Sequence, residues 1–150
     1  MQKITPFLWF DDKAEEAMHF YLSIFKNSKP GRVTRSGGSV VSVTFTLEGQ
    51  EFMALNGGPH YQFTPALSLF VDCKTQAEVD ELWEKLSAGG KIDRCGWLRD
   101  KYGLSWQIIP SALGEMLYDS DPARAQRVMQ AMLKMDKIDI EGLRKARDES

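Results

Sequence analysis

The chain has 150 residues, 43% of them hydrophobic, and a formal net charge of −2, which predicts one domain with a sizeable core. Because charges of both signs are mixed along the chain, its composition argues against nucleic acid or an anionic membrane surface as a partner. It has no apolar run long enough to span a bilayer and no signal-peptide pattern at its N-terminus, so we expect a cytoplasmic protein. Cys73 and Cys95 lack CxxC spacing and fit reduced thiols.

The N-terminal part of the sequence predicts a strand followed by an amphipathic helix. Residues 4–10 are apolar and aromatic, as in a strand. Asp12 and Glu15 have the spacing of a capping pair at the start of a helix. The apolar positions of that helix then recur at helical spacing: Ala14, Ala17, Met18, Tyr21, Leu22 and Phe25.

Residues 27–32 are turn formers, and residues 33–47 predict a strand with one apolar and one hydroxyl-lined face. Glu48-Gly49 predicts a tight reversal into a partner strand. That strand ends where the breakers Asn56-Gly57-Gly58-Pro59 begin a loop through His60 and Thr64. The apolar positions of the first of these strands are Val41, Val43, Phe45 and Leu47.

The same order of elements then returns. Residues 66–72 predict a strand, Thr75 with Glu78 a capping box, and Gly89-Gly90 the end of the helix. Two more strands are expected at about residues 96–100 and 105–110. The buried stripe of this second helix is expected at Val79, Leu82, Trp83 and Leu86.

Beyond Pro110 the pattern is helical only. Asp121-Pro122 is a good helix start, and Asp139 is expected to cap a last short helix. We expect this tail to pack on the sheet or on a second subunit. Its apolar positions are Ala125, Val128, Met129, Met132 and Leu133, then Ile140, Leu143 and Ala146.

The two halves superpose in residue character, which predicts an internal duplication. Leu8 is placed on Leu69 and Asp11 on Asp72, and further along Gly49 on Gly103 and Phe52 on Trp106. Met53 and Gln107 each come four residues after their glycine, and neither is a carboxylate.

The segments ALNGGPH and CGWLRDKYGLSWQI carry the most specific part of a resemblance that spans nearly the whole chain. The sequence resembles the PhnB-like branch of the vicinal oxygen chelate (glyoxalase and bleomycin-resistance) superfamily. The resemblance implies an α+β fold in which two βαβββ modules form a curved mixed sheet around a cleft, with C-terminal helices. We expect a single such domain over residues 1–150, with modules at about 1–64 and 65–110 and a helical tail at 111–150.

The resemblance also implies where a metal site would lie. In metal enzymes of the superfamily, a first-strand residue and a late-strand residue of each module supply histidine and glutamate ligands. These positions fall here near Thr5 or Pro6, near Pro65 or Ala66, and at Met53 and Gln107. None of them is a histidine, carboxylate or cysteine, so we expect neither a metal site of the usual kind nor another cofactor.

Proteins of this branch often bear the name demethylubiquinone methyltransferase. A methyltransferase that uses S-adenosylmethionine ordinarily has a glycine-rich turn between its first strand and the next helix. Here that position holds Asp11-Asp12-Lys13, and Gly37-Gly38 and Gly57-Gly58 do not lie between a strand and a helix. The sequence gives the methyltransferase name no chemical support.

The expected cleft is lined by aromatic, thioether and neutral polar side chains, which suits a small, largely uncharged organic ligand. Strand parity places Phe7 and Trp9 on the cleft face with Met53 and Gln107, and turns Phe52, Ala54, Trp106 and Ile108 to the helices. The expected ligand-contacting residues are Phe7, Trp9, Met53, Asn56, His60, Trp97 and Gln107.

Several of these residues have a second interpretation. His60 is the candidate general acid or base, or else an exposed loop histidine. Gln107 orients a ligand or is an amide satisfied within the protein, and Trp9 and Trp97 are stacking platforms or core. For Cys95 a buried structural thiol is preferred over a nucleophile, and for His19 a solvated position on the first helix.

Two classes of function follow. One is a metal-independent protein that binds a small molecule, and the other is a glyoxalase-like enzyme, of lyase, isomerase or dioxygenase type, with an atypical site. Members of the superfamily commonly complete their clefts with a second copy, so we also expect a homodimer.

Overall fold

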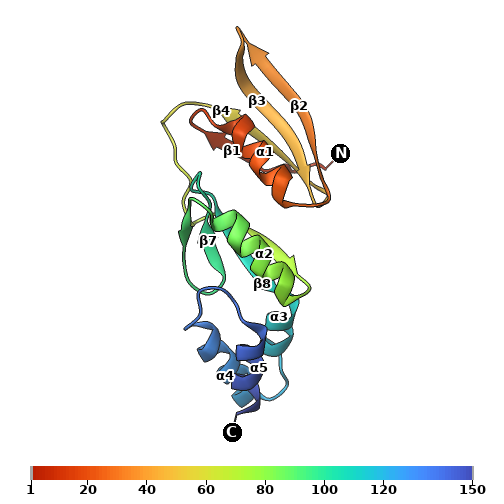
Figure 1. The fold of residues 1–150 in the computed structure, drawn as a ribbon, viewed down its shortest axis with the longest axis vertical. Coiled ribbons are helices and arrows are strands. Elements are labelled where there is room, and N and C mark those ends of the chain that lie inside the picture. Colours follow the sequence, from red (N-terminus) through yellow and green to blue (C-terminus); the bar gives the residue numbers. More distant parts are fainter. Residues whose placement is uncertain (1, 150) are drawn as a thin grey trace. The chain divides into compact units, whose positions relative to one another are not determined.

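The computed structural model describes residues 2–149 and divides into two compact units, one up to Phe63 and one from Thr64 onwards. Each unit contains the predicted order of strand, helix and three strands (Figure 1). The first unit consists of β1 (Phe7–Phe10), α1 (Ala14–Ile24), β2 (Ser28–Ser36), β3 (Ser39–Leu47) and β4 (Gln50–Asn56). The second begins with β5 (Ser68–Cys73), α2 (Gln76–Ser87), β6 (Lys91–Ile92), β7 (Trp97–Arg99) and β8 (Ser105–Pro110). The expectation of an α+β fold with two βαβββ modules is confirmed.

The two sheets have the same topology. The strand order is β1-β4-β3-β2 in the first and β5-β8-β7-β6 in the second. The first strand of each module pairs in parallel with the last, and the other pairs are antiparallel. This repeated topology agrees with the internal duplication that the sequence predicts.

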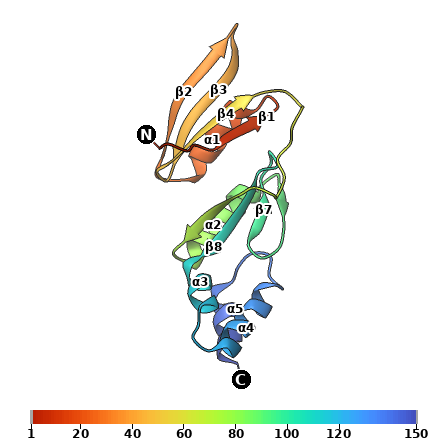
Figure 2. The ribbon, with the colours of Figure 1, turned by 180° about the vertical axis from the view of Figure 1, so that it is seen from behind.

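Each sheet has one face covered by the helix of its own unit and one face free of it (Figures 1 and 2). In the first unit, Met18 and Tyr21 of α1 are buried, and so are Val43 and Phe45 of β3. The rings of Tyr21 and Phe45 lie 6.2 Å apart. The alternation predicted for this strand is correct at Val43, Phe45 and Leu47, which are buried, whereas Val41 is 44% exposed.

Two strand predictions in the first unit were wrong. The first strand begins at Phe7, and Ile4 is 86% exposed. Residues 28–36, which had been divided between a turn and the start of a long strand, form β2, and Gly37-Gly38 turns the chain into β3. β2 is an edge strand with register shifts after Pro30 and Thr34. Proline and glycine are tolerated in edge strands and bulges, which explains why this strand resembles a turn in the sequence.

The predicted cap of α1 was also wrong. Lys13 is the N-cap residue and makes no side-chain capping bond. Instead, Asn56 at the end of β4 receives a hydrogen bond from the amide of Ala14 on its Oδ1, at 2.8 Å. Its Nδ2 donates to the Val40 carbonyl at 3.2 Å. A side chain from a distant strand thus satisfies one of the helix-end amides that have no partner within the helix.

The second helix follows its prediction closely. Thr75 is the N-cap, and its hydroxyl accepts from the Glu78 amide at 3.1 Å. The Glu78 carboxylate reaches back one residue further than in a standard capping box and accepts from the Lys74 amide at 2.7 Å. The four residues predicted as its stripe, Val79, Leu82, Trp83 and Leu86, are buried.

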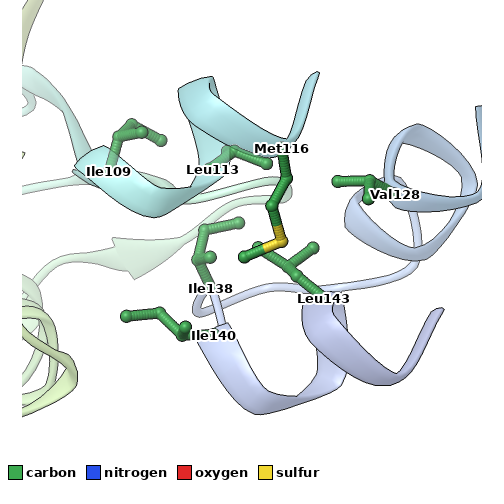
Figure 3. Close-up of a cluster of buried hydrophobic side chains, with 7 residues drawn as sticks. All are labelled: Ile109, Leu113, Met116, Val128, Ile138, Ile140 and Leu143. Carbon is green, nitrogen blue, oxygen red and sulfur yellow. The ribbon is translucent and has the colours of Figure 1, made fainter. Parts of the chain in front are cut away.

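The tail forms α3 (Ser111–Leu117), α4 (Pro122–Met132) and α5 (Ile140–Asp148) and belongs to the second unit. The predicted caps Asp121 and Asp139 are confirmed, since each accepts from an amide two residues on. Figure 3 shows Met116 of α3 pointing toward Ile138 and Leu143 within a buried cluster that includes Ile109 at the end of β8. Met129 and Leu133 were expected on the packed face but are 36% and 46% exposed. In residues 2–149, no helix is long and apolar enough to cross a membrane.

Candidate functional site

The helix-free face of each sheet carries a row of residues set by strand register. In the first sheet, Met53 is paired with Phe7 on one side and with Thr44 on the other. In the second sheet, Gln107 is paired with Phe70 and Trp97 in the same way. Because residues directly opposite each other share a face, each row presents its side chains together.

These rows correct the superposition of the two halves. If Ala54 is equivalent to Ile108, their partners on the first strands are Leu8 and Val71. The sequence comparison matched Leu8 with Leu69, whereas the strand register matches it with Val71, two residues later. Since a shift of two keeps the same face of a strand, the predicted division into helix side and free side survives. Phe52, Ala54, Trp106 and Ile108 are all buried as predicted.

The row in the second sheet combines aromatic and amide groups. Phe70 is 60% exposed, and its equivalent in the first sheet, Phe7, is 51% exposed. Gln107 and Trp97 are half-buried. The Gln107 Nε2 donates to the Ser68 hydroxyl at 2.9 Å, which fixes the amide plane. The Gln107 Oε1 accepts no hydrogen bond from the described residues, so the row offers a neutral acceptor between two aromatic rings.

Arg99 and Asp93, two charged residues close to the row, form an ion pair. Arg99 lies two residues from Trp97 along β7. Its guanidinium donates from Nε and Nη2 to the two carboxylate oxygens of Asp93, each at 3.1 Å. Such a bidentate pair fixes both side chains and leaves the face without an unpaired charge from these two groups.

Trp9 is held by the loop that follows β4. Its Nε1 donates to the Gly58 carbonyl at 2.9 Å, and its ring meets the Tyr61 ring edge-on at 4.9 Å. A Cβ at Gly57 would lie 2.3 Å from the indole, so only glycine allows this approach. Trp9 thus has a structural role in anchoring the loop.

The remaining predicted residues of the first unit differ in exposure and in hydrogen bonding. His60 lies exposed in the same loop, next to Gly58, and forms no ion pair with the acidic side chains of residues 2–149. Asn56 uses both ends of its amide within the first unit, on Ala14 and Val40. His19 is exposed on α1, as preferred from the sequence.

Asp100 is a buried residue that the sequence reasoning missed. It is only 2% exposed, and its carboxylate accepts from the amides of Tyr102 and Leu104 and from the indole Nε1 of Trp106, at 2.9–3.1 Å. The sequence contains a signal for this role. An aspartate whose side chain accepts the amide two residues later forms an Asx-turn, and Asp100 stands two residues before Tyr102 and three before Gly103. Asp100 fixes the connection between β7 and β8 and therefore the register of Gln107.

A depression of about 490 Å³ lies on the first unit alone. Thr46 and Glu51 in its wall are paired across β3 and β4 and belong to the same face as Met53. Lys29 is paired with Thr46 from the other side. Apart from Gly49 the described lining residues are polar, and the residues expected from the sequence to contact a ligand are not among them. The described residues that line it are Gln2, Asn27, Ser28, Lys29, Thr46, Gly49 and Glu51.

The two cysteines differ in environment. Cys73 is fully buried in β5, and burial, with smaller contributions from Glu78 and Asp72, raises the pKa of its thiol to about 12. Cys95, expected to be buried, is half-buried and has a left-handed backbone with φ of 60°. Neither forms a disulfide.

We predict that Cys73 stays unmodified by iodoacetamide in the native protein at pH 8, because the thiolate is the reactive species. The native state holds this proton more tightly than the unfolded chain, whose thiol pKa is about 8.5. The thiol's contribution to stability is therefore full below that pH and is lost as the pH rises toward 12. Peptide mass spectrometry with and without urea measures the labelling, and equal labelling rates in both conditions would contradict the prediction.

The donor set does not fit the metal site that the resemblance implies. Met53 and Gln107 occupy the late-strand positions, and their partners on β1 and β5 are phenylalanines. The Pro6 carbonyl already accepts the Met53 amide at 3.0 Å. Within residues 2–149, no three or more His, Cys, Asp or Glu side chains are grouped as a metal ion requires.

Comparisons with known proteins agree with this fold. A model of the family described as 3-demethylubiquinone-9 3-methyltransferase matches residues 2–109. The chain is similar to the solved structure of a PhnB protein from Bacillus cereus that bears the same methyltransferase name. The two are 42% identical with a TM-score of 0.70, over 73% of this chain and 100% of that one. A comparison with curated proteins gave no significant match.

Two more distant structures share the fold alone. One is a glyoxylase/bleomycin resistance protein/dioxygenase domain from Frankia sp., 16% identical with a TM-score of 0.52 over 73% of this chain and 92% of that one. The other is the fosfomycin resistance protein FosX from Listeria monocytogenes, 17% identical with a TM-score of 0.56 over 77% and 97%. The family model and the Bacillus cereus relative show that this chain belongs to the family described as 3-demethylubiquinone-9 3-methyltransferase, in which that relative is a PhnB protein.

Proposed function

We propose that this protein binds a small, largely uncharged organic molecule on the helix-free face of its second sheet, without a metal ion. The observation that carries the proposal is the row Trp97, Gln107 and Phe70, which sets a neutral amide between two aromatic side chains. Sites for small organic ligands combine apolar and aromatic surface with few polar groups that fix orientation.

The chemistry of the row supports an uncharged ligand with a hydrogen-bond donor. The Gln107 Nε2 is used by Ser68, so the group open to a ligand is the amide oxygen. Arg99 is paired with Asp93, which makes it a poor receptor for an anion unless that pair breaks. A ring between Trp97 and Phe70 would gain stacking or edge contacts with both.

A metal-independent site follows from the residue types at the late-strand positions. A thioether and a neutral amide are weak partners for zinc, iron or manganese compared with imidazole and carboxylate. We therefore propose that the ligand is held by protein groups alone.

The methyltransferase reading of the family name has less support. Both strand-to-helix connections of the two modules, Asp11 to Lys13 and Lys74 to Thr75, lack glycine. A nucleotide-like cofactor such as S-adenosylmethionine is ordinarily held by a glycine-rich turn at such a junction. An enzyme that uses His60 as its general acid or base remains the alternative, and an exposed loop histidine is compatible with it.

The proposal can be tested with N-phenylnaphthylamine, a neutral fluorescent probe that has two aromatic groups and one N–H donor. We expect the wild-type protein to bind it, and Gln107→Ala to weaken binding about five- to thirtyfold, the value of one to two kcal/mol for a lost hydrogen bond. The unfolding free energy of this variant should change by less than about 1 kcal/mol, because Gln107 is half-buried and makes one side-chain bond.

Ser68→Ala is the matched control, since it removes the partner of Gln107 and leaves the amide oxygen in place. We expect it to weaken probe binding less than Gln107→Ala does. A large loss of stability in Gln107→Ala with unchanged probe affinity would mark the residue as a structural amide and refute the proposed site.

A further inference from the structure

Residues 135–140, which lead into α5, are held on one side by α2, where Gln76 bonds their backbone and Asp80 pairs with Lys137. The Gln76 Nε2 donates to the Ile138 carbonyl at 2.9 Å, and its Oε1 accepts the Ile140 amide at 2.8 Å. Gln76 therefore binds the backbone of the segment as a neighbouring strand would. Asp80, one turn further along α2, accepts from both Gln76 and Lys137 at 2.9 Å.

The other side of the same segment holds the residues that lead into β7. The amides of Cys95 and Gly96 donate to the carbonyls of Met135 and Asp136, both at 2.8 Å. Gly96 has a φ of +84°, and a Cβ there would lie 2.7 Å from Ile109 and 3.1 Å from Ile138. Only glycine therefore allows the segment to approach so closely.

This contact continues into the proposed ligand face. The Gly96 carbonyl accepts the Ile108 amide at 2.8 Å, and the next residue, Trp97, is paired with Gln107. Hydrogen bonds thus connect Gln76 to residues 135–140 and these residues to Gly96. The next residue, Trp97, forms one end of the row that contains Gln107 and Phe70.

The tail lies outside the part of the chain that defines the family. The family model ends at residue 109, and the whole Bacillus cereus structure corresponds to 73% of this chain. The segment at residues 135–140 is therefore an addition to the matched region that makes backbone contacts next to Trp97.

We propose that Gln76 is a positioning residue, which clamps residues 135–140 against Gly96 and so sets the orientation of Trp97 beside Gln107. The inference rests on the proposed function, because it gives Trp97 a role in ligand recognition. It predicts that removing the Gln76 hydrogen bonds to residues 135–140 changes the orientation of Trp97. Removing hydrogen bonds between other parts of the tail should not change that orientation.

The test uses the full chain labelled with fluorotryptophan, in which Trp97→Phe assigns the Trp97 resonance in the fluorine NMR spectrum. We expect Gln76→Ala to shift or broaden that resonance and to weaken binding of N-phenylnaphthylamine about two- to thirtyfold, the range of coupling through contact networks. Gln76→Glu keeps the acceptor for Ile140 but turns a carboxylate oxygen toward the Ile138 carbonyl and the Asp80 carboxylate, so its effects should be at least as large. Gln76→Asn, which is uncharged but one methylene too short to reach both backbone groups, replaces Gln76→Ala if the latter does not fold.

Arg127→Ala is the matched control. Arg127 donates to the carbonyls of Ala146 and Arg147 and so ties α4 to α5 away from the clamp. It should lower stability while leaving the Trp97 resonance and probe affinity unchanged. An unchanged Trp97 resonance in the Gln76 variants, or an equal shift in Arg127→Ala, would overturn the clamp. Failure of the wild-type protein to bind the probe would instead count against the proposed function, while the resonance still tests the clamp.

Discussion

Replacing Asp100 with alanine is expected to lower the free energy of unfolding by about 3–5 kcal/mol, because buried N–H groups lose a charged acceptor at about 1.5–3 kcal/mol for each bond. The variant removes the carboxylate that accepts from the amide of Leu104 and from the indole N–H of Trp106, and both of these bonds are buried. Urea denaturation followed by circular dichroism measures the loss.

Two conservative variants separate the parts of this network. Asp100→Asn can keep an oxygen toward the two backbone amides but must turn an NH2 group toward the indole of Trp106. Trp106→Phe removes the indole donor and so should relieve that conflict, which gives favourable coupling in a double-mutant cycle. Stability of Asp100→Asn equal to that of the wild type, or additive effects in the cycle, would contradict this account of the turn.

The second large effect is expected for Asn56→Ala, which should destabilise the protein by about 2–3 kcal/mol through loss of a helix cap and a second bond. The amide of Ala14 and the carbonyl of Val40 both lose their partner in this variant. Hydrogen exchange at the Ala14 amide should become faster, which is a local readout of the cap.

Asn56→Asp serves as the control because it retains an oxygen acceptor for Ala14 and adds a negative charge at a helix N-terminus, which is favourable there. We expect its stability to lie between those of the wild type and Asn56→Ala. If Asn56→Ala unfolds like the wild type but loses affinity for a ligand, Asn56 is a binding residue, as the sequence predicted, and its structural role is minor.

The sequence predicted most features that depend on the alternation of residues along a strand or on a few neighbouring residues. Leu8, Phe52 and Ile108 were placed on the helix side from alternation alone, and all three are buried. The α2 cap at Thr75 and the starts of α4 and α5 at Asp121 and Asp139 followed from short patterns within a few residues. Such features are set by neighbouring residues and need no knowledge of distant contacts.

Features that depend on distant partners were missed or misplaced. The cap of α1 comes from Asn56, which no local pattern around Asp12 reveals. The register between the halves was shifted by two residues because few identities mark it, and a shift of two leaves the alternation unchanged. β2 was hidden because a polar edge strand with Pro30 and Gly31 has the composition of a turn. Ligand binding, homodimerisation and the cytoplasmic location stay predictions.

We propose that this chain recognises its ligand with neutral protein groups and holds no metal. Elemental analysis of protein incubated with zinc, manganese, iron and nickel salts and then passed through a desalting column tests it most directly. We expect far less than one ion of each metal per chain, because Met53 and Gln107 stand where ligands would be required. One ion per chain that is retained after desalting, and lost in Gln107→Ala, would contradict the account.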